Sequence, residues 1–125
     1  MDEKEPKPLL IIDDDKASSM VLKFRLQSMG NFVVHLADCG QTGLEAVSKE
    51  RPAVVLCDMN LPDSNGEGLV KQIKDLMPEA AVFVLTADNR AEDEARCRAA
   101  GADAYLTKPL DVDRFLQVIL PKFLN

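Results

Sequence analysis

The amino-acid sequence predicts a doubly wound α/β fold, in which a five-stranded parallel sheet lies between two layers of helices. Short and almost wholly apolar runs recur along the chain, as expected of strands that are buried on both faces. Segments with apolar residues at helical spacing separate these runs. Because strands that alternate with helices pair in parallel through right-handed crossovers, this alternation predicts helices on both faces of one sheet. We therefore expect five strands and five helices in a single domain.

The first half of the chain supplies three of the strands and two of the helices. The apolar runs predict strands at residues 9–12, 32–36 and 53–57. Between the first two strands, an apolar stripe at helical spacing predicts a helix that Gly30 ends. The members of this stripe are Val21, Leu22, Phe24, Leu26 and Met29. A shorter second helix carries Leu44, Ala46 and Val47 and stops near Pro52.

A third helix, a fourth strand and a fourth helix follow. The third helix ends before Pro78, and the strand covers residues 82–85. The apolar residues of the third helix are Leu69, Val70, Ile73, Leu76 and Met77. The fourth helix, residues 89–100, is poor in large apolar residues and ends at Gly101. Its expected inward face is Ala91, Ala95 and Ala99, and its expected i,i+4 ion pairs are Glu92–Arg96 and Glu94–Arg98.

The chain ends with a short strand at residues 104–107 and a fifth helix. Six apolar residues at helical spacing give this helix one continuous apolar face, made of Val112, Phe115, Leu116, Ile119, Leu120 and Phe123. Because Pro121 has no backbone N–H, we expect it to kink this helix or to end it early.

Length, composition and charge narrow the class of protein. With 125 residues, 46% hydrophobic and 29% charged, the chain has the size and composition of one globular domain. Its net charge of −6 disfavours non-specific binding to nucleic acid or to an anionic membrane, since both attract basic surfaces. No apolar run is long enough to span a membrane, and residues 1–7 lack the apolar core of a signal peptide. We therefore expect a cytoplasmic protein with a polar lead-in, 1–7, and one domain, 8–125.

The cysteines and the single histidine carry no recognisable site. Cys39, Cys57 and Cys97 have neither the spacing of a zinc site nor an even number for pairing, so we expect free thiols that are buried or half-buried. His35 is expected on an edge strand, where one imidazole alone forms neither a catalytic triad nor a metal cluster.

Acidic side chains stand at the ends of two of the apolar runs. Asp13, Asp14 and Asp15 follow the first strand, and Asp58 follows the third. The carboxyl ends of parallel strands meet at one edge of a sheet, which is where ligands bind in open α/β folds. The carboxylates would repel one another there unless a cation compensated their charge. Since Mg²⁺ prefers oxygen ligands and often takes one or two carboxylates together with phosphate, the pattern predicts a magnesium site.

The other strand ends add groups that suit a phosphoryl ligand. Asn60, two residues after Asp58, can offer its backbone carbonyl to the metal. Lys108 supplies a compact cation and Thr86 a hydroxyl for phosphoryl oxygens. Such a set suits phosphoryl transfer, in which positioning and charge neutralisation supply most of the catalysis and a carboxylate can itself accept the phosphoryl group.

Four stretches in this order, LLIIDDD, LCDMNLPDSNG, VFVLTA and AGADAYLTKP, resemble the receiver domain of two-component response regulators. The resemblance extends from residue 8 to about residue 124. It implies a flavodoxin-like sheet with the strand order 2-1-3-4-5. It also implies a phosphorylated signalling switch that is not a turnover enzyme.

The resemblance implies a role for each acid of the pocket. Asp58 is similar to the family's phosphoacceptor, and Asp14 to its direct Mg²⁺ ligand. Asp13 is similar to the acid that holds the metal through a water molecule, and Asn60 to the residue whose backbone carbonyl binds it.

The same resemblance implies the moving parts of a switch. Thr86 matches the switch hydroxyl, and Tyr105 the aromatic residue that turns inward when that hydroxyl moves. Lys108 resembles the family's phosphate-binding lysine. The resemblance also implies that the peptide bond between Lys108 and Pro109 is cis. Asp88 occupies a position that modulates dephosphorylation in the family.

Simpler structural roles compete for several of these residues. Asp15 is expected to cap the first helix rather than to bind metal. Residues 62–66 favour a turn that enters a helix over contact with phosphate. For Asp88, capping of the fourth helix and tuning of dephosphorylation are both open. Leu110 stands where a phenylalanine often follows the Lys-Pro pair of the family.

By this resemblance, a histidine kinase or a histidine phosphotransfer protein donates its phosphoryl group to Asp58 with Mg²⁺ present. The face made by the fourth helix, the fifth strand and the fifth helix then changes its affinity for a downstream output protein or domain. An Mg²⁺-dependent phosphatase with an aspartyl nucleophile is an alternative, but Asn60 cannot transfer the proton that such an enzyme needs. A degenerate receiver that acts only as a binding module is another, although no pocket residue is missing. The output and any dimerisation are left open.

Overall fold

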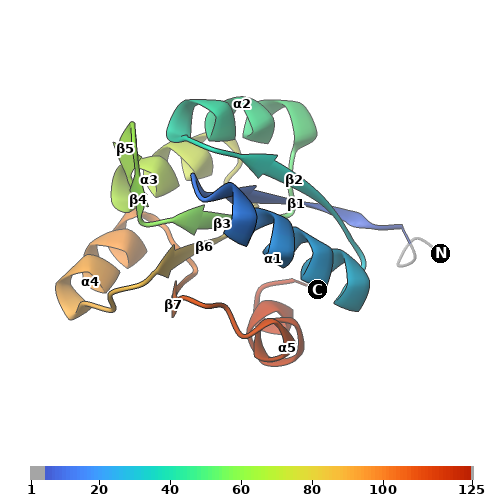
Figure 1. Ribbon diagram of the computed structural model, residues 1–125. Coiled ribbons are helices and arrows are strands. Elements are labelled where there is room, and N and C mark those ends of the chain that lie inside the picture. The colour runs from blue at the N-terminus through green and yellow to red at the C-terminus, as the bar shows by residue number, and fades with distance from the viewer. Residues whose placement is uncertain (1–4, 125) are drawn as a thin grey trace.

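The computed structural model describes residues 5–124 as one sheet between two layers of helices (Figure 1). The strands of the main sheet are β1 (Lys7–Ile12), β2 (Phe32–Ala37), β3 (Val54–Asp58), β6 (Ala81–Thr86) and β7 (Ala104–Thr107). They pair in parallel in the order β2-β1-β3-β6-β7. Counted along the chain, this is the order 2-1-3-4-5, so the predicted fold class and strand order are confirmed. The expected lead-in lies partly outside the described residues, and Lys7 already pairs with Phe32 in the sheet.

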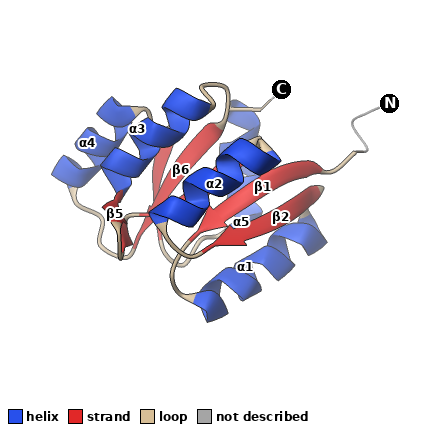
Figure 2. Ribbon diagram, turned by 90° about the horizontal axis from the view of Figure 1, so that it is seen from above, coloured by secondary structure: helices blue, strands red, loops and turns tan. Residues whose placement is uncertain are grey.

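Helices cover both faces of this sheet, with α1 and α5 on one side and α2, α3 and α4 on the other (Figure 2). Their bounds are α1 (Lys16–Met29), α2 (Gly40–Glu50), α3 (Gly66–Leu76), α4 (Ala91–Ala100) and α5 (Val112–Arg114). The fifth helix continues through a π-helical turn, Phe115–Ile119, in which the N–H of Leu120 bonds to the carbonyl of Phe115. A 3₁₀ turn with Pro121 then ends it, as expected of a proline that cannot continue the helical hydrogen bonds.

Two apolar cores form because alternate residues of each central strand face opposite sides of the sheet. In β1, Leu10 packs on the side of α2, α3 and α4, whereas Leu9 packs on the side of α1 and α5. On the second side, the ring of Phe83 contacts the rings of Phe115 and Phe123 edge-on, at centroid distances of 5.1 and 5.4 Å. The C-terminal helical segment is thereby held against β6. The thiols of Cys57 and Cys97 are buried and free, as expected.

The apolar stripe predicted for α1 is only partly buried. Leu26 is fully buried and Leu22 half-buried, but Val21, Phe24 and Met29 are 61%, 72% and 44% exposed. The helix that the stripe predicts is present and ends before Gly30, but the stripe does not mark which of its residues are buried. Helical spacing shows which residues share a face, whereas the sheet covers only the narrower strip that includes Leu22 and Leu26.

The inward face predicted for α4 is wrong. Ala91, Ala95 and Ala99 are all exposed, and Cys97 is the buried residue of this helix. The ion pair Glu94–Arg98 is confirmed at 2.8 Å. Arg96, however, pairs with Glu67 of α3 and with Asp93 instead of Glu92, because Arg96 points toward α3.

A short hairpin that the sequence did not reveal follows β3. Its strands are β4 (Asn60–Leu61) and β5 (Ser64–Asn65), and of these only β5 lies within residues 62–66, the segment expected to be a turn. Gly66 begins α3 directly after it and donates its N–H to the carbonyl of Met59 at 2.7 Å. A Cβ on Gly66 would lie 2.8 Å from the sulfur and 3.2 Å from the Cα of Met59, so only glycine allows this approach.

Strand β2 forms one edge of the sheet, and His35 lies on it as expected, 3.5 Å from a carboxylate oxygen of Glu50. The N–H of Val34 donates to the side-chain oxygen of Gln27 in α1 at 3.1 Å. Part of the hydrogen-bonding capacity of this edge is thus taken up within the domain. Within residues 5–124, none of the helices is both long and apolar enough to cross a bilayer.

Candidate functional site: an acidic pocket at the sheet edge

The carboxyl ends of β1 and β3 bring three carboxylates together. The two strands are neighbours, with Ile12 opposite Cys57 in the register, so the residues that follow these positions emerge side by side. Ligand oxygens of Asp13, Asp14 and Asp58 all lie within 4.8 Å of one another. The sequence prediction that these acids share one site is therefore correct.

Lys108 joins this cluster from the end of β7. Its ammonium Nζ lies 3.0 Å from Oδ2 of Asp13 and 3.3 Å from Oδ1 of Asp58. Its backbone N–H donates to the carbonyl of Thr86 at 2.7 Å, which fixes the end of β7 to the end of β6. The bond from Lys108 to Pro109 is cis, as the resemblance implies. One cation thus bridges two carboxylates from different strands.

The electrostatics of the pocket are those of a partly buried charge cluster. The side chain of Asp58 is 13% exposed, and burial raises the pKa of its carboxyl, with a smaller contribution from the charge of Asp13. The ammonium of Lys108 opposes this rise in the pKa of Asp58. Burial alone would lower the pKa of Lys108, but its hydrogen bond to Asp13 and the charge of Asp58 outweigh burial and raise that pKa. Lys108 therefore stays charged and offsets the negative charge of Asp13 and Asp58.

The donor set fits a divalent cation. Both oxygens of Asp13 already accept a hydrogen bond, one from the N–H of Asp15 at 2.9 Å and the other from Lys108. This suits a contact with metal through a water molecule. Asp14 is exposed, and Asp58 shares the edge with it, so these two can offer oxygens directly. Asn60 lies exposed at the start of β4, immediately beyond Asp58 and Met59.

Thr86 and Tyr105 lie buried on neighbouring strands beside the pocket. Thr86 is 3% exposed, and its hydroxyl donates to the carbonyl of Asp88 and accepts from the N–H of Asp88, both at 3.1 Å. The hydroxyl is thus bound by its own loop and not by Asp58. Tyr105 is 8% exposed, so its ring already faces inward, and its hydroxyl has no hydrogen-bond partner within residues 5–124. Burial raises the pKa of Tyr105.

The structure decides several of the local alternatives. Asp15 caps α1, accepting from the N–H and the hydroxyl of Ser18, and these bonds lower the pKa of Asp15. Capping of α4 by Asp88 is wrong, because that helix begins at Ala91 after Arg90, and the Asp88 carboxylate instead pairs with Arg90 at 2.9 Å. The loop after Thr86 is thus longer than the sequence suggested.

Residues 62–66 have structural roles, and one of them was missed. Asn65 caps α3 by accepting from the N–H of Gly68 at 2.8 Å. Asp63 accepts from the N–H groups of Gly40 and Gln41 at 2.7 and 3.0 Å, so it caps the start of α2. These bonds lower the pKa of Asp63. No local sequence signal could reveal this contact, since the partners are more than twenty positions apart.

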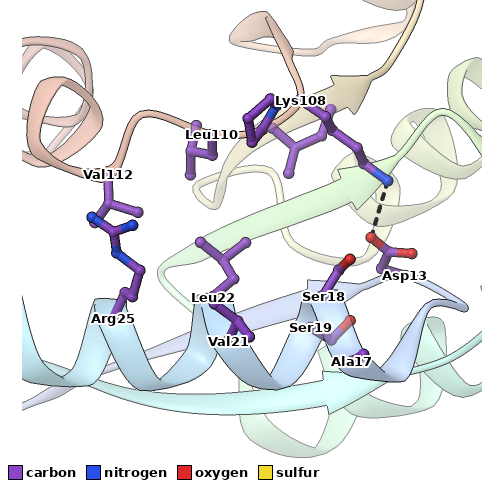
Figure 3. A pocket seen from close by; sticks show the side chains of 12 residues that line it. Asp13, Ala17, Ser18, Ser19, Val21, Leu22, Arg25, Lys108, Leu110 and Val112 are labelled. Atoms are coloured by element: carbon purple, nitrogen blue, oxygen red, sulfur yellow. Dashed lines mark hydrogen bonds and ion pairs between the residues drawn. The ribbon is translucent and has the colours of Figure 1, made fainter.

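A groove of about 500 Å³ opens beside the Asp13–Lys108 pair (Figure 3). Figure 3 shows α1 along one side of it, with Val21, Leu22 and Arg25, and the segment from Lys108 to Val112 along the other. Most of its lining is apolar. No sequence pattern indicates this groove, because its two walls are far apart in the chain and only the fold brings them together.

A family model supports the same interpretation as the geometry. Residues 9–120 match the model of the response regulator receiver domain. Among curated proteins, the chain is 36% identical over 116 residues to the transcriptional regulatory protein ZraR of Escherichia coli. The alignment covers 93% of this chain and 26% of that protein, so the chain spans about a quarter of the length of this relative.

Solved structures of receivers have the same fold. A CheY-like response regulator receiver domain protein from Methanospirillum hungatei superposes with a TM-score of 0.87 and 31% identity, over 95% of this chain and 94% of that one. A response regulator from Burkholderia pseudomallei, crystallised with a phosphorylated aspartic acid, calcium ion and citrate, gives a TM-score of 0.83 and 29% identity over 88% of this chain and 64% of that one. Together with the acidic pocket and the bridging lysine, these matches show that the chain belongs to the response regulator receiver domain family.

Proposed function

We propose that this chain is a phosphoacceptor switch of a two-component phosphorelay, with Asp58 as the acceptor. The observation that carries the proposal is Lys108, whose ammonium touches Asp13 and Asp58 at the mouth of a metal-competent acidic pocket. An oxygen of Asp58 attacks the phosphorus of a phosphohistidine, the P–N bond breaks, and the imidazole of the donor leaves with the electron pair. Lys108 neutralises charge on the transferred group.

Asp14 and Asp58 would hold Mg²⁺ directly, with the carbonyl of Asn60 as a further ligand and Asp13 acting through water. Bound there, the metal supplies charge neutralisation at the phosphoryl oxygens. Thr86 gives up its bonds to Asp88 and turns its hydroxyl toward the phosphoryl group. Asp88 lies at the entrance and modulates dephosphorylation, and Tyr105 packs behind Thr86.

The donor is a histidine kinase or a histidine phosphotransfer protein, and it approaches over the groove beside α1. That groove ends at the Asp13–Lys108 pair, and the neighbouring face of α1 exposes Val21 and Phe24. Helix α1 carries Lys16, Lys23 and Arg25 and no acid, in a chain whose net charge is −6. An apolar surface with acidic residues around it is therefore the complementary partner.

The output partner is a downstream protein or domain that recognises the face of α4, β7 and α5. The chain promotes only its own phosphorylation and dephosphorylation and is not a turnover enzyme. It acts in the cytoplasm, where free thiols such as its three cysteines persist. A phosphatase is disfavoured because Asn60 offers no carboxyl for proton transfer, and a purely binding receiver because the whole pocket is present.

The test compares wild type with Asp58→Asn after treatment with acetyl phosphate and Mg²⁺. Intact mass should show one added phosphoryl group on wild type, none on Asp58→Asn, and none on wild type in EDTA. Asp63→Asn is the matched control, because Asp63 caps α2 outside the pocket and should not affect the modification. Phosphorylation of the Asp58→Asn chain to the wild-type extent would show that the acceptor is another residue.

A further inference from the structure

Helix α4 is attached to the rest of the domain by few apolar contacts. Cys97 is its buried residue, with its sulfur 3.6 Å from the sulfur of Met59. By comparison, α3 buries Gly66, Leu69, Val70 and Ile73. Burial of apolar side chains supplies most of the free energy that packs a surface helix against its domain. Because α4 buries so little, polar contacts contribute more to its position than they do for α3.

The C-terminal end of α4 is well anchored. Arg98 donates to the carbonyl of Asp103 at 3.4 Å, and the carboxylate of Asp103 accepts from the N–H of Val82 at 2.8 Å. Lys74 of α3 pairs with the same carboxylate at 3.1 Å and donates to the carbonyl of Ala80 at 2.6 Å. Both members of the Lys74–Asp103 pair are mostly buried, so this end of α4 is tied to α3 and to the sheet.

The middle of α4 has one side-chain ion pair with α3. The Nε of Arg96 lies 2.9 Å from Oε1 of Glu67, in the first turn of α3, and Arg96 also bonds to Asp93. The capping position, Arg90, makes no capping bond from its side chain. These residues surround a cavity of about 400 Å³ that Thr86 and Asn60 also line. The tie therefore sits beside the groups that must respond to a phosphoryl group.

We propose that the Arg96–Glu67 ion pair is a latch that holds α4 against α3 from the middle of the helix, and that activation at Asp58 requires its release. The inference rests on the proposed function for its second half only. Helix α4 pivots about its anchored C-terminal end, and the latch sets how much of the unphosphorylated chain is already released. A weaker latch enlarges that fraction, and a ligand that binds the released state then binds more tightly by the same factor.

The first measurement is the rate at which the buried thiol of Cys97 reacts with iodoacetamide, followed by peptide mass spectrometry so that Cys39 and Cys57 are scored separately. An exposed ion pair favours its closed state by a factor of about 1.5 to 5. Glu67→Gln and Arg96→Gln should therefore both speed modification of Cys97, on the order of that factor. The charge of Glu67 raises the pKa of the Cys97 thiol and the charge of Arg96 lowers it, so a direct charge effect alone would speed one variant and slow the other, and that outcome contradicts the latch. The double variant should be no faster than Arg96→Gln, because Arg96→Gln has already removed the pair with Glu67.

Glu79→Gln is the matched control. It makes the same change in charge and breaks an exposed ion pair with Arg51, on the far side of α3 from α4, so its Cys97 should react at the wild-type rate. If Glu67→Gln and Arg96→Gln also react at the wild-type rate, the pair is not a latch and the proposal is overturned.

The second measurement is the apparent affinity for beryllium fluoride with Mg²⁺, by calorimetric titration. Both latch variants should bind it more tightly than wild type, by the factor seen in the thiol rates. Faster thiol modification with unchanged affinity would overturn the link between the latch and activation. A wild-type chain that takes up no beryllium fluoride would contradict the proposed function instead, and the thiol rates, measured without it, would still decide whether the pair holds α4 closed.

Discussion

At the scale of single residues, Lys108 explains how two partly buried carboxylates from different strands tolerate each other. Asp13 and Asp58 both lie within 3.3 Å of its ammonium, and all three side chains are largely shielded from water. A buried cluster of this kind contributes little to stability, since desolvation offsets most of the attraction between the charges. The cluster of Asp13, Asp58 and Lys108 is therefore better explained by a role in binding or reaction than by a contribution to the stability of the fold.

Asp58→Asn is expected to make the folded chain more stable at neutral pH. Burial raises the pKa of Asp58 above its unfolded value, so the ionised carboxylate is disfavoured in the folded state and reduces stability at pH 7. As the pH falls through the raised pKa, the carboxyl protonates and this loss disappears. The increase in the free energy of unfolding that Asp58→Asn causes should therefore become smaller as the pH is lowered from 7 towards 4. Urea unfolding followed by circular dichroism measures this free energy, and Glu45→Gln, at an exposed position, is the control.

Ser19→Ala is expected to raise the free energy of unfolding by about 0.5–1 kcal/mol. The hydroxyl of Ser19 is buried in α1 and has no hydrogen-bond partner within residues 5–124. Alanine removes that unsatisfied group and is a better helix former. Exposed Ser48→Ala in α2 gains only helix propensity and should stabilise less. A loss of stability in Ser19→Ala would mean that the hydroxyl is hydrogen-bonded after all.

At the scale of secondary-structure elements, the start of α3 is fixed to the end of β3 by a close approach of two backbones. The N–H of Gly66 bonds to the carbonyl of Met59, which directly follows Asp58. The caps at Asn65 and Asp63 hold the same hairpin to α3 and α2. The position of the Asp58 carboxylate thus depends on a loop that touches two helices.

Gly66→Ala should destabilise the domain by about 1–3 kcal/mol, as expected when a side chain is forced into a packed site. The new Cβ would press on the sulfur and the Cα of Met59, and α3 would have to move away from the strand end. Phosphorylation of Asp58 should slow as a result. Gly68→Ala is the control, because its Cβ would meet only the capping side chain of Asn65. Equal stability of the two variants, by thermal unfolding, would contradict the packing argument.

Amide hydrogen exchange should be faster in α4 than in α3. Exchange follows local opening, and opening is easier where few apolar side chains are buried. Cys97 alone is buried in α4, whereas four residues are buried in α3. Mass spectrometry of peptic peptides resolves the two helices. Equal protection of both would show that the polar ties of α4 compensate fully for its small buried surface.

At the scale of the whole molecule, one sheet separates two cores, but the sheet itself is shared by both. Phe83 fills the core under α1 and α5, and Leu69 the core under α2, α3 and α4. Because adjacent residues of each strand serve opposite cores, neither core can be lost while the sheet persists intact. We therefore expect the domain to unfold in a single transition.

Phe83→Ala and Leu69→Ala test this expectation from opposite faces. Both side chains are fully buried, so truncation should cost about 3–5 kcal/mol for the phenylalanine and about 2–5 kcal/mol for the leucine. In both variants the urea concentration at the midpoint of unfolding should fall, whereas the dependence of the unfolding free energy on urea concentration should stay as in wild type. Since the chain has no tryptophan, circular dichroism is the signal. A second transition in either variant would show that the cores unfold separately.

The sequence allowed the fold and most of the pocket to be predicted, because both follow from strand ends. Buried runs that finish in Asp13 or Asp58 place their acids at one edge whatever covers the sheet. What failed depends on neighbours that spacing does not specify. Phe24 shares an apolar stripe with Leu22, but the side chain of Phe24 is exposed because the sheet covers only part of that stripe. Asp63 caps a helix that is distant along the chain. Arg96 pairs with Glu67 of α3, although Glu92 is much nearer to it in the sequence.

The contact between Gln27 and the edge strand has a consequence for how this domain meets other proteins. An open edge invites another chain to add a strand, which leads to uncontrolled association. By occupying the N–H of Val34, the side chain of Gln27 makes β2 a poorer template for such pairing. Specific encounters are then left to helix surfaces, whose side chains discriminate between partners in a way that a bare backbone does not.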